Sequence, residues 1–303
     1  MLLKIVPFEI LFEEVGHMIK GDVITSRQNA SVIAACKLSE KKHRDAEGKF
    51  RIDGIKLFEE AVLSGVDIET VFVRQGAVDR LEERIGDLFD KISGTDIKIL
   101  SDGVFDKISE EKSPEGILCV VKRIDKLHKI VTINNDDDLK TETILASHAK
   151  IFAVESVRDP GNLGTIIRTA AAFGVDVLLI SYDCADIYNS KTVRAAMGAL
   201  FRQKIIRTSN FSEVLRFLSR NGRTTYAATL GKEAVLLGND TPDESGCIVV
   251  GNEGHGLSEK TIEACDHNIL IPMAEGAESL NAAIAASVCM WEQFGKHITN
   301  HSI

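Results

Sequence analysis

The sequence lacks the features that direct a chain to a membrane, a secretory route or a metal. No apolar run approaches the length of a membrane span, and Pro7, Glu9 and Glu13 interrupt the N-terminal stretch where a secretory signal needs unbroken apolar residues. None of the six cysteines forms a Cys-x-x-Cys pair, and no spacing of His and Cys matches a zinc site. We therefore expect a cytoplasmic protein in a reducing compartment, with no membrane contact and no metal.

Three catalytic signatures are also missing. The chain has no Gly-x-Ser-x-Gly nucleophile turn and no Gly-x-x-x-x-Gly-Lys-Ser/Thr phosphate loop. It has no Gly-x-Gly-x-x-Gly fingerprint after a strand either. A nicotinamide-dependent oxidoreductase would need that fingerprint at an early strand-to-helix turn, with an acidic residue about 20 residues later. This class of enzyme is therefore disfavoured.

Basic residues are outnumbered by acidic ones over the whole chain but are concentrated in one segment. The 36 Lys and Arg against 45 Asp and Glu give a net charge of −9, unlike a wholly basic nucleic-acid-binding protein. Residues 27–51, however, carry seven basic and three acidic residues, a local charge of +4. This segment is either a solvated helix face or a surface that binds RNA. In the second case the candidate RNA contacts are Arg27, Lys41, Lys42 and Arg44.

The remaining composition is that of a folded α/β protein with two domains. Hydrophobic residues make up 44% and charged residues 27% of 303 residues. Strand-like and helix-like segments alternate in residues 23–121 and again, more strongly, from Ile151 onward. The polar run 134–138 between them is typical of a linker or exposed turn. We predict an N-terminal extension (1–22), a smaller α/β domain (23–121), a linker (122–149) and a parallel-sheet domain (150–303).

The first candidate loop for chemistry follows the strand predicted at 151–155. Its Asp-Pro-Gly-Asn turn, 159–162, leads directly into a helix, and Arg168 lies six residues after Asn162. A helix start with free N–H groups attracts anions, and a nearby arginine adds a bidentate fork for phosphate. The alternative is an ordinary capped helix with a surface arginine.

Two further candidate loops lie towards the C-terminus. The Gly-Asn-Glu-Gly-His-Gly sequence at 251–256 places three glycines directly after an apolar strand, which allows a ligand close to the backbone. A plain turn is the alternative there. Further on, a strand runs into Pro272 and a polar loop before Ser279 and Asn281, which open an alanine-rich helix. Ser279 is alternatively the N-cap of that helix.

Taken in order, these loops resemble the motifs of the SpoU (TrmH-like) family of SPOUT RNA methyltransferases. The matching segments are 162–168 within Asp-Pro-Gly-Asn-Leu-Gly-Thr-Ile-Ile-Arg-Thr-Ala, Gly251-Asn-Glu-Gly-His-Gly-Leu-Ser, Ile271-Pro-Met with Glu-Ser-Leu-Asn-Ala-Ala, and Arg194-Ala-Ala-Met-Gly-Ala-Leu-Phe. The segments Ile24-Thr-Ser-Arg-Gln-Asn, Phe50-Arg-Ile-Asp-Gly and Val71-Phe-Val resemble the small L30e-like RNA-binding domain of the ribosomal RNA members. Asp53 stands where many of those relatives have glutamate.

The resemblance implies an enzyme that transfers a methyl group from S-adenosylmethionine to a ribose 2′-hydroxyl of structured RNA. Ribosomal RNA is the expected substrate, and transfer RNA is the alternative within this class. A non-catalytic RNA-binding protein is the alternative of another class, although such a protein would be expected to lose Arg168, Asn281 or the glycine loop. The resemblance also implies a trefoil knot in the C-terminal domain, and a homodimer with its active sites at the interface.

The same resemblance assigns roles to individual residues. The implied cofactor-binding residues are Leu230, Gly251, Ile271, Met273 and Leu280. The implied catalytic residues are Asn162, Arg168, Glu253, Ser279 and Asn281. Because a protein arginine stays protonated, we expect Arg168 to bind the RNA phosphate beside the target ribose and to stabilise the developing alkoxide. Glu253 and a water molecule are then the candidates for accepting the proton.

Overall fold

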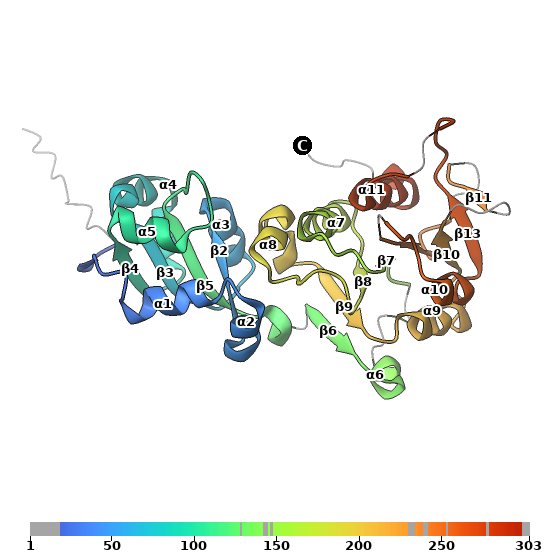
Figure 1. The fold of residues 1–303 in the computed structure, drawn as a ribbon, viewed down its shortest axis with the longest axis horizontal. Helices are drawn as coiled ribbons and strands as arrows, with labels where there is room; N and C mark the ends of the chain where they lie inside the picture. Colours follow the sequence, from blue (N-terminus) through green and yellow to red (C-terminus); the bar gives the residue numbers. More distant parts are fainter. Residues whose placement is uncertain are drawn as a thin grey trace, which may run out of the picture.

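The chain folds into two α/β domains that lie side by side (Figure 1). The computed structural model describes residues 19–127, 129–141, 145, 148–229, 234–238, 242–252, 254–276 and 279–298. Most of the predicted N-terminal extension lies outside these residues. Among the helices in these ranges, none is long and apolar enough to cross a membrane.

The N-terminal domain is built on a mixed sheet whose described strands run in the order β1-β4-β3-β5-β2. These strands are β1 (Val23–Ile24), β2 (Lys49–Asp53), β3 (Ile68–Arg74), β4 (Asp96–Leu100) and β5 (Ile117–Lys122). The helices α1 (Ala30–Lys37) and α5 (Asp102–Ile108) pack on one face, and α3 (Ile55–Leu63) and α4 (Val78–Asp90) on the other. The short helix α2 (Lys41–Glu47) precedes β2 at the side nearer the second domain (Figure 1).

The C-terminal domain is built on a sheet whose described strands are all parallel, as predicted, in the order β11-β13-β10-β12-β7-β8-β9-β6. The strands are β6 (Ile130–Ile133), β7 (Ile151–Val154), β8 (Val177–Ser181), β9 (Lys204–Thr208), β10 (Thr225–Ala228), β11 (Val235–Leu236), β12 (Cys247–Val250) and β13 (His267–Leu270). The α/β fold class predicted from the sequence is therefore confirmed for both domains. The knot implied by the resemblance stays a prediction.

Both faces of this sheet are buried because successive strand residues point to opposite sides. Phe152 and Val154 pack in one core cluster with α7 (Pro160–Ala172), α8 (Ser190–Ala196) and α11 (Ala282–Gln293). Ile151 and Ala153 pack in a second cluster with α9 (Phe211–Arg220) and α10 (Glu259–Ala264). Figure 1 shows α7 and α11 on one side of the strands and α9 and α10 on the other. The helix α7, which carries Asn162 and Arg168, thus shares a layer with α11, which begins directly after Asn281.

The segment 122–149, predicted as a linker, contributes a strand to the C-terminal sheet. Strand β6 pairs in parallel with β9 and buries Ile130 and Ile133. The polar run 134–138 follows directly and forms the turn into α6 (Asp136–Thr141). A strand of four residues is too short to show a clear alternation of apolar and polar residues, and a polar run follows it. The sequence therefore did not predict this strand. The domain boundaries themselves stay a prediction.

The two domains contact each other through the loop between β8 and α8. The guanidinium of Arg44 donates to Asp186 at 2.7 Å and to the carbonyl oxygens of Leu38 and Ser39 at 2.9 and 2.6 Å. Arg44, predicted as an RNA contact, has a side chain that is only 3% exposed. That prediction is wrong, because this cation is engaged in holding the domains together.

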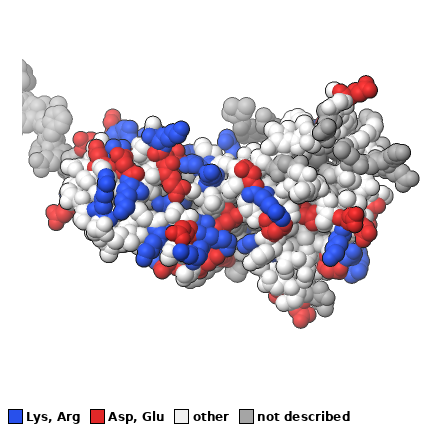
Figure 2. Space-filling view, viewed as in Figure 1, with Lys and Arg blue, Asp and Glu red and all other residues white. Residues whose placement is uncertain are grey.

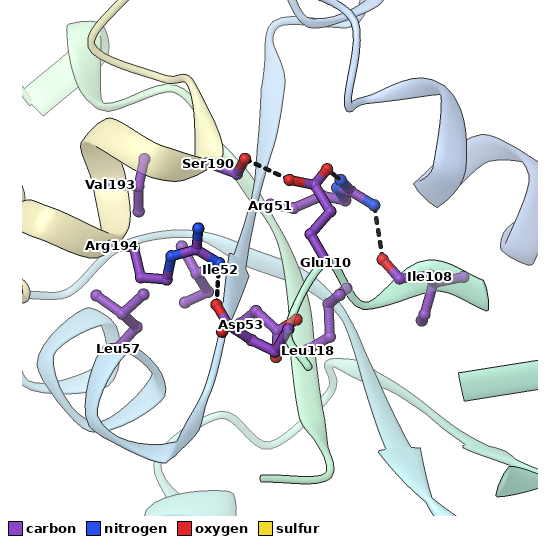
Figure 3. A pocket seen from close by; sticks show the side chains of 11 residues that line it. Arg51, Ile52, Asp53, Leu57, Ile108, Glu110, Leu118, Ser190, Val193 and Arg194 are labelled. Carbon is purple, nitrogen blue, oxygen red and sulfur yellow. Dashed lines mark hydrogen bonds and ion pairs between the residues drawn. The ribbon is translucent and has the colours of Figure 1, made fainter. Parts of the chain in front are cut away.

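A second set of contacts joins the N-terminal domain to α8 and to the loop before it. The rings of Phe50 and Tyr188 lie 4.7 Å apart, and the Tyr188 hydroxyl donates to Asp125 at 2.6 Å. The Ser190 hydroxyl donates to Glu110 at 2.5 Å, and Arg194 forms an ion pair with Glu111. We refer to these pairs and Arg44–Asp186 together as the domain seam. Figure 3 shows the part of the seam where β2 faces α8 around a small cavity.

Candidate active site

The first candidate loop leaves the carboxyl end of β7 and enters α7. The Asp159 carboxylate accepts the backbone N–H of Asn162 at 2.8 Å and caps the helix, and Pro160 occupies its first turn. Before the cap, Ser156 adopts a left-handed backbone with φ 55°, which is uncommon for a residue with a side chain. The chain therefore turns sharply between the buried strand and the helix, and places Asn162 at the carboxyl edge of the sheet.

Arg168 lies on the same helix, six residues after Asn162. An α-helix rises about 1.5 Å per residue, so the two Cα atoms are about 9 Å apart along the axis. The Arg168 side chain is exposed and makes no hydrogen bond or ion pair with any residue that the structure describes. Its guanidinium is thus available to an anion from solution, as the phosphate-clamp interpretation requires.

Asn281 joins this loop to the third candidate loop. Its side-chain amide Nδ2 donates to Oδ1 of Asn162 at 3.1 Å. Its Oδ1 accepts the backbone N–H of Ala283 at 2.9 Å and of Ile284 at 3.3 Å, and so caps α11. The helix begins at Ala282, and Asn281 rather than Ser279 is the N-cap. Two predicted catalytic residues that are 119 positions apart in sequence are therefore in direct contact.

The second candidate loop folds back on itself after β12. The backbones of Asn252 and Gly256 exchange N–H to carbonyl hydrogen bonds of 3.0 and 2.9 Å. A Cβ atom on Gly251 would lie 2.4 Å from the carbonyl carbon and oxygen of Gly256, so only glycine fits there. Glu253, predicted as a catalytic residue, lies outside the described residues.

The Asn252 side chain connects the second loop to the first. Its Oδ1 accepts the backbone N–H of Gly254 at 2.8 Å, and its Nδ2 donates to the carbonyl oxygen of Ser156 at 2.8 Å. The sequence contains this asparagine in the glycine motif but gives no sign of its partner 96 residues away.

A cavity of about 520 Å³ opens between these loops at the carboxyl ends of β10, β12 and β13. The predicted cofactor residues Gly251, Ile271, Met273 and Leu280 all line it, and so does Ser279, which was predicted to be catalytic. Leu230 lies outside the described residues. The remaining lining residues are Ala228, Thr229, Val250, Asn252, Gly254, His255, Gly256, Ile269, Leu270, Ala282 and Ala285.

The cavity fits a nucleoside cofactor in size and in chemistry. Ligand pockets for small molecules typically measure about 300–1,000 Å³, and are mainly apolar with a few polar groups that fix orientation. Here apolar side chains form the walls, whereas the glycine loop brings backbone groups to the ligand without intervening side chains. Gly251, Ile271, Met273 and Leu280 are the residues that would hold S-adenosylmethionine.

Glu155 is a site residue that the sequence interpretation missed. It directly follows the buried strand β7, and its carboxylate accepts hydrogen bonds from the backbone N–H and the hydroxyl of Ser258, both at 2.8 Å. The Thr261 hydroxyl donates to it as well, at 2.7 Å. Glu155 thereby fixes the end of the glycine loop and the start of α10. Its partners are more than 100 residues away, so only the unusual position of an acid at the end of an apolar strand could have signalled it.

The other predicted RNA contacts remain on the surface of the N-terminal domain. Lys41 pairs with Asp45 at 2.6 Å, Lys42 with Glu40 at 2.9 Å, and Arg27 donates to the Gly103 carbonyl at 3.2 Å. All of these contacts are exposed, so they are weak and leave the cations accessible to phosphate. On the face shown in Figure 2, Lys and Arg atoms lie mostly over the N-terminal domain, interleaved with acidic atoms.

The chain matches two known families and several known proteins. Residues 149–291 match the SpoU rRNA Methylase family, and residues 29–119 match the MRM3-like substrate binding domain. The 23S rRNA (guanosine(2553)-2'-O)-methyltransferase RlmP of Bacillus subtilis is 32% identical over 273 residues, which cover 90% of this chain and 99% of that protein. The 23S rRNA (guanosine-2'-O-)-methyltransferase RlmB of Haemophilus influenzae is 29% identical over 73% of this chain and 87% of its own length.

A solved structure has the same two-domain architecture. The AdoMet-bound rRNA methyltransferase from Sinorhizobium meliloti superposes with a TM-score of 0.73 at 26% identity, over 92% of this chain and 99% of that one. The similarity thus extends through both domains and includes the three loops around the cavity. The chain belongs to the SpoU rRNA methylase family.

Proposed function

We propose that this S-adenosylmethionine-dependent methyltransferase acts on ribosomal RNA and methylates one ribose 2′-hydroxyl. The observation that carries the proposal is the Asn281–Asn162 hydrogen bond, which joins the helix beside the cofactor cavity to the helix that bears Arg168. A methyl donor in the cavity and an RNA phosphate on Arg168 would then be held by two helices, α11 and α7, that this hydrogen bond joins. Residues 29–119 match a substrate binding domain, which supports an RNA chain rather than a single nucleotide as the substrate.

The residues around the cavity divide the work of the reaction. S-adenosylmethionine supplies a methyl group that is already electrophilic, so the protein has to position the ribose oxygen in line and ease the loss of its proton. Arg168 holds the phosphate beside the target ribose and stabilises the charge that develops on the oxygen. Asn162 and Asn281 fix the geometry through their hydrogen bond, and Ser279 lies at the cavity wall. Glu253 or a water molecule accepts the proton.

A guanosine of 23S rRNA is the target we propose. The RlmP and RlmB relatives are both named for methylation of a guanosine in 23S rRNA. RlmP aligns over nearly its whole length, which includes the N-terminal domain. We further propose that the enzyme works in the cytoplasm, where its six unpaired cysteines suit a reducing compartment.

The enzyme is, we propose, a homodimer that covers an apolar stripe on α11. Ile284 and Trp291 are 52% and 49% exposed, and their spacing of seven residues places them on one side of the helix. The ring centres of Trp291 and Phe173 lie 5.7 Å apart, and Phe173 directly follows α7, so the stripe reaches the end of the helix that bears Arg168. Large apolar side chains grouped in this way typically mark an interface. A second copy on this face would bring two active sites together.

Label transfer tests the substrate. We would incubate the protein with methyl-labelled S-adenosylmethionine and, separately, with unmodified 23S rRNA, precursor large-subunit particles and unmodified transfer RNA. We expect label in 23S rRNA or its particles, at one alkali-resistant dinucleotide that contains a guanosine. Label in transfer RNA alone would replace ribosomal RNA as the substrate, and label in none of the three would contradict the proposal.

A further inference from the structure

An exposed tyrosine lies at the carboxyl end of β8, beside the first catalytic loop. Tyr182 is 55% exposed, and the guanidinium of Arg207 lies 4.2 Å from the centre of its ring. Arg207 also donates a hydrogen bond of 2.8 Å to the Tyr182 carbonyl oxygen. The arginine is therefore fixed against the ring, and the pair presents an exposed aromatic side chain beside a positive charge.

Hydrogen bonds connect this surface to both loops of the active site. The backbone N–H of Ser156 donates to the hydroxyl of Ser181, the residue before Tyr182, at 2.8 Å. The Ser156 hydroxyl donates to Asp183, the residue after it. The Ser156 carbonyl in turn accepts the side-chain amide of Asn252 from the glycine loop. Tyr182 is thus held in a fixed position relative to the loops that carry the chemistry.

Further charges on this edge suit a nucleic acid. Arg158, on the first catalytic loop, has a side chain that is 70% exposed and lies 3.5 Å from Asp183. Hydrogen bonds from Ser156 and Ser181 outweigh partial burial and hold the pKa of Asp183 below its usual value, so this carboxylate positions Arg158 by charge. Three residues beyond Asp183, Asp186 binds Arg44 of α2, the helix that carries Lys41 and Lys42. The segment that begins at Tyr182 therefore contacts the first catalytic loop through Asp183 and the cationic helix of the N-terminal domain through Asp186.

We propose that Tyr182 and Arg207 form a stacking platform for the base of a nucleotide next to the target, and that Arg158 contacts the phosphate of that nucleotide. Sequence-specific RNA recognition mostly uses unpaired bases that stack on aromatic rings and on arginine planes. Stacking of this kind tolerates different bases, because every base has a π face, and the hydrogen-bonded loops leave the platform little freedom to move. The proposal rests on the RNA methyltransferase function and adds a subsite to it.

We would test the platform by steady-state kinetics on a 23S rRNA fragment, with three variants of Tyr182, one of Arg158 and one of Arg216. Tyr182→Ala removes the ring, Tyr182→Leu keeps apolar volume without a π face, and Tyr182→Phe keeps the face. We expect Ala and Leu to raise KM for RNA by roughly 5- to 100-fold and Phe to leave it nearly unchanged. The affinity for S-adenosylmethionine without RNA should stay within about twofold of the parent in all three.

Of the two arginine variants, Arg158→Ala tests the phosphate contact and Arg216→Ala is its matched control. Arg158→Ala should raise KM for RNA and flatten its dependence on salt, because one phosphate contact is lost. Arg216→Ala removes another arginine paired with an acid, on α9 at the opposite face of the sheet, and should change neither. An unchanged KM for both Tyr182→Ala and Tyr182→Leu would overturn the platform. A parent protein that methylates no RNA would overturn the proposed function instead, so the two failures are distinct.

Discussion

At the scale of single residues, the site depends as much on the absence of a side chain at Gly251 as on the polar side chains around it. Gly251 lets the second loop fold back so that its backbone lines the cofactor cavity. We expect Gly251→Ala to weaken S-adenosylmethionine binding at least 10-fold, because its Cβ would lie 2.4 Å from backbone atoms that cannot move independently. Gly103→Ala, in the N-terminal domain and outside the cavity lining, is the control, since its Cβ would meet only the end of the Arg27 side chain, at 3.8 Å. Calorimetric titration with the cofactor measures both, and equal affinities would contradict this account of the loop.

The sequence was informative about residues whose role depends on a local pattern. Arg168 and Gly251 stand in short motifs, and the structure places them on the exposed side of α7 and at the cavity. Residues whose role depends on a distant partner were misread or missed. The positive charge of its own segment predicts an RNA contact for Arg44, whereas its partner in the structure, Asp186, lies 142 residues away. Glu155 was overlooked for the same reason.

At the scale of elements, the tight contact between α7 and α8 sets the position of the catalytic helix. A Cβ atom on Gly164 would lie 2.4 Å from the Thr192 carbonyl oxygen and 2.6 Å from the Ala195 Cβ. We expect Gly164→Ala to force the two helices apart, to cost about 1–3 kcal/mol of stability and to lower methyl transfer more than cofactor binding. Denaturant unfolding, with methylation and binding assays on the same sample, measures these effects. The neighbouring exposed variant Thr165→Ala should be close to the parent, and an unaffected Gly164→Ala would contradict the packing argument.

The buried strands could be predicted because a short apolar run between two loops is compatible with few structures other than a buried strand. The strands predicted at 151–155 and directly before the glycine loop are present as β7 (Ile151–Val154) and β12 (Cys247–Val250), and they pair in parallel. The edge strands were not predictable. Strand β11 has two residues and β6 has four, so their place in the sheet depends on pairing with β13 and β9 rather than on their own periodicity.

At the scale of the whole molecule, the domain seam holds a carboxyl group that favours its protonated form. Burial raises the pKa of Asp53 from 3.8 to about 6, and the negative charge of Glu111 adds to this, while the hydrogen bond from Ser109 opposes it. Because the unfolded chain releases this proton near pH 4 and the folded chain only near pH 6, the folded state binds more protons in between. The contribution of Asp53 to stability is therefore largest below about pH 4 and is lost as the pH rises to 6.

Asp53→Asn should remove this dependence, because the amide stays neutral like the protonated acid. We expect the variant and the parent to have similar free energies of unfolding at pH 3, below the pKa of the unfolded chain. At pH 7.5 the variant should be more stable by up to about 3 kcal/mol. Denaturant titrations at the two pH values measure the difference, and a parent that is as stable as the variant at pH 7.5 would show that Asp53 is not held in this way.

The central proposal is that Arg168 binds the RNA while the cavity holds the cofactor. The most direct test is single-turnover methylation of 23S rRNA by the parent, Arg168→Lys and Arg168→Ala, with cofactor affinity measured on the same preparations. We predict that Arg168→Ala slows transfer by about 100-fold or more and that Arg168→Lys, which keeps the charge without the fork, lies between. Cofactor affinity should stay unchanged, and the product should be an alkali-resistant ribose. An Arg168→Ala enzyme that transfers within a few-fold of the parent, or a methyl group found on a base, would contradict the account.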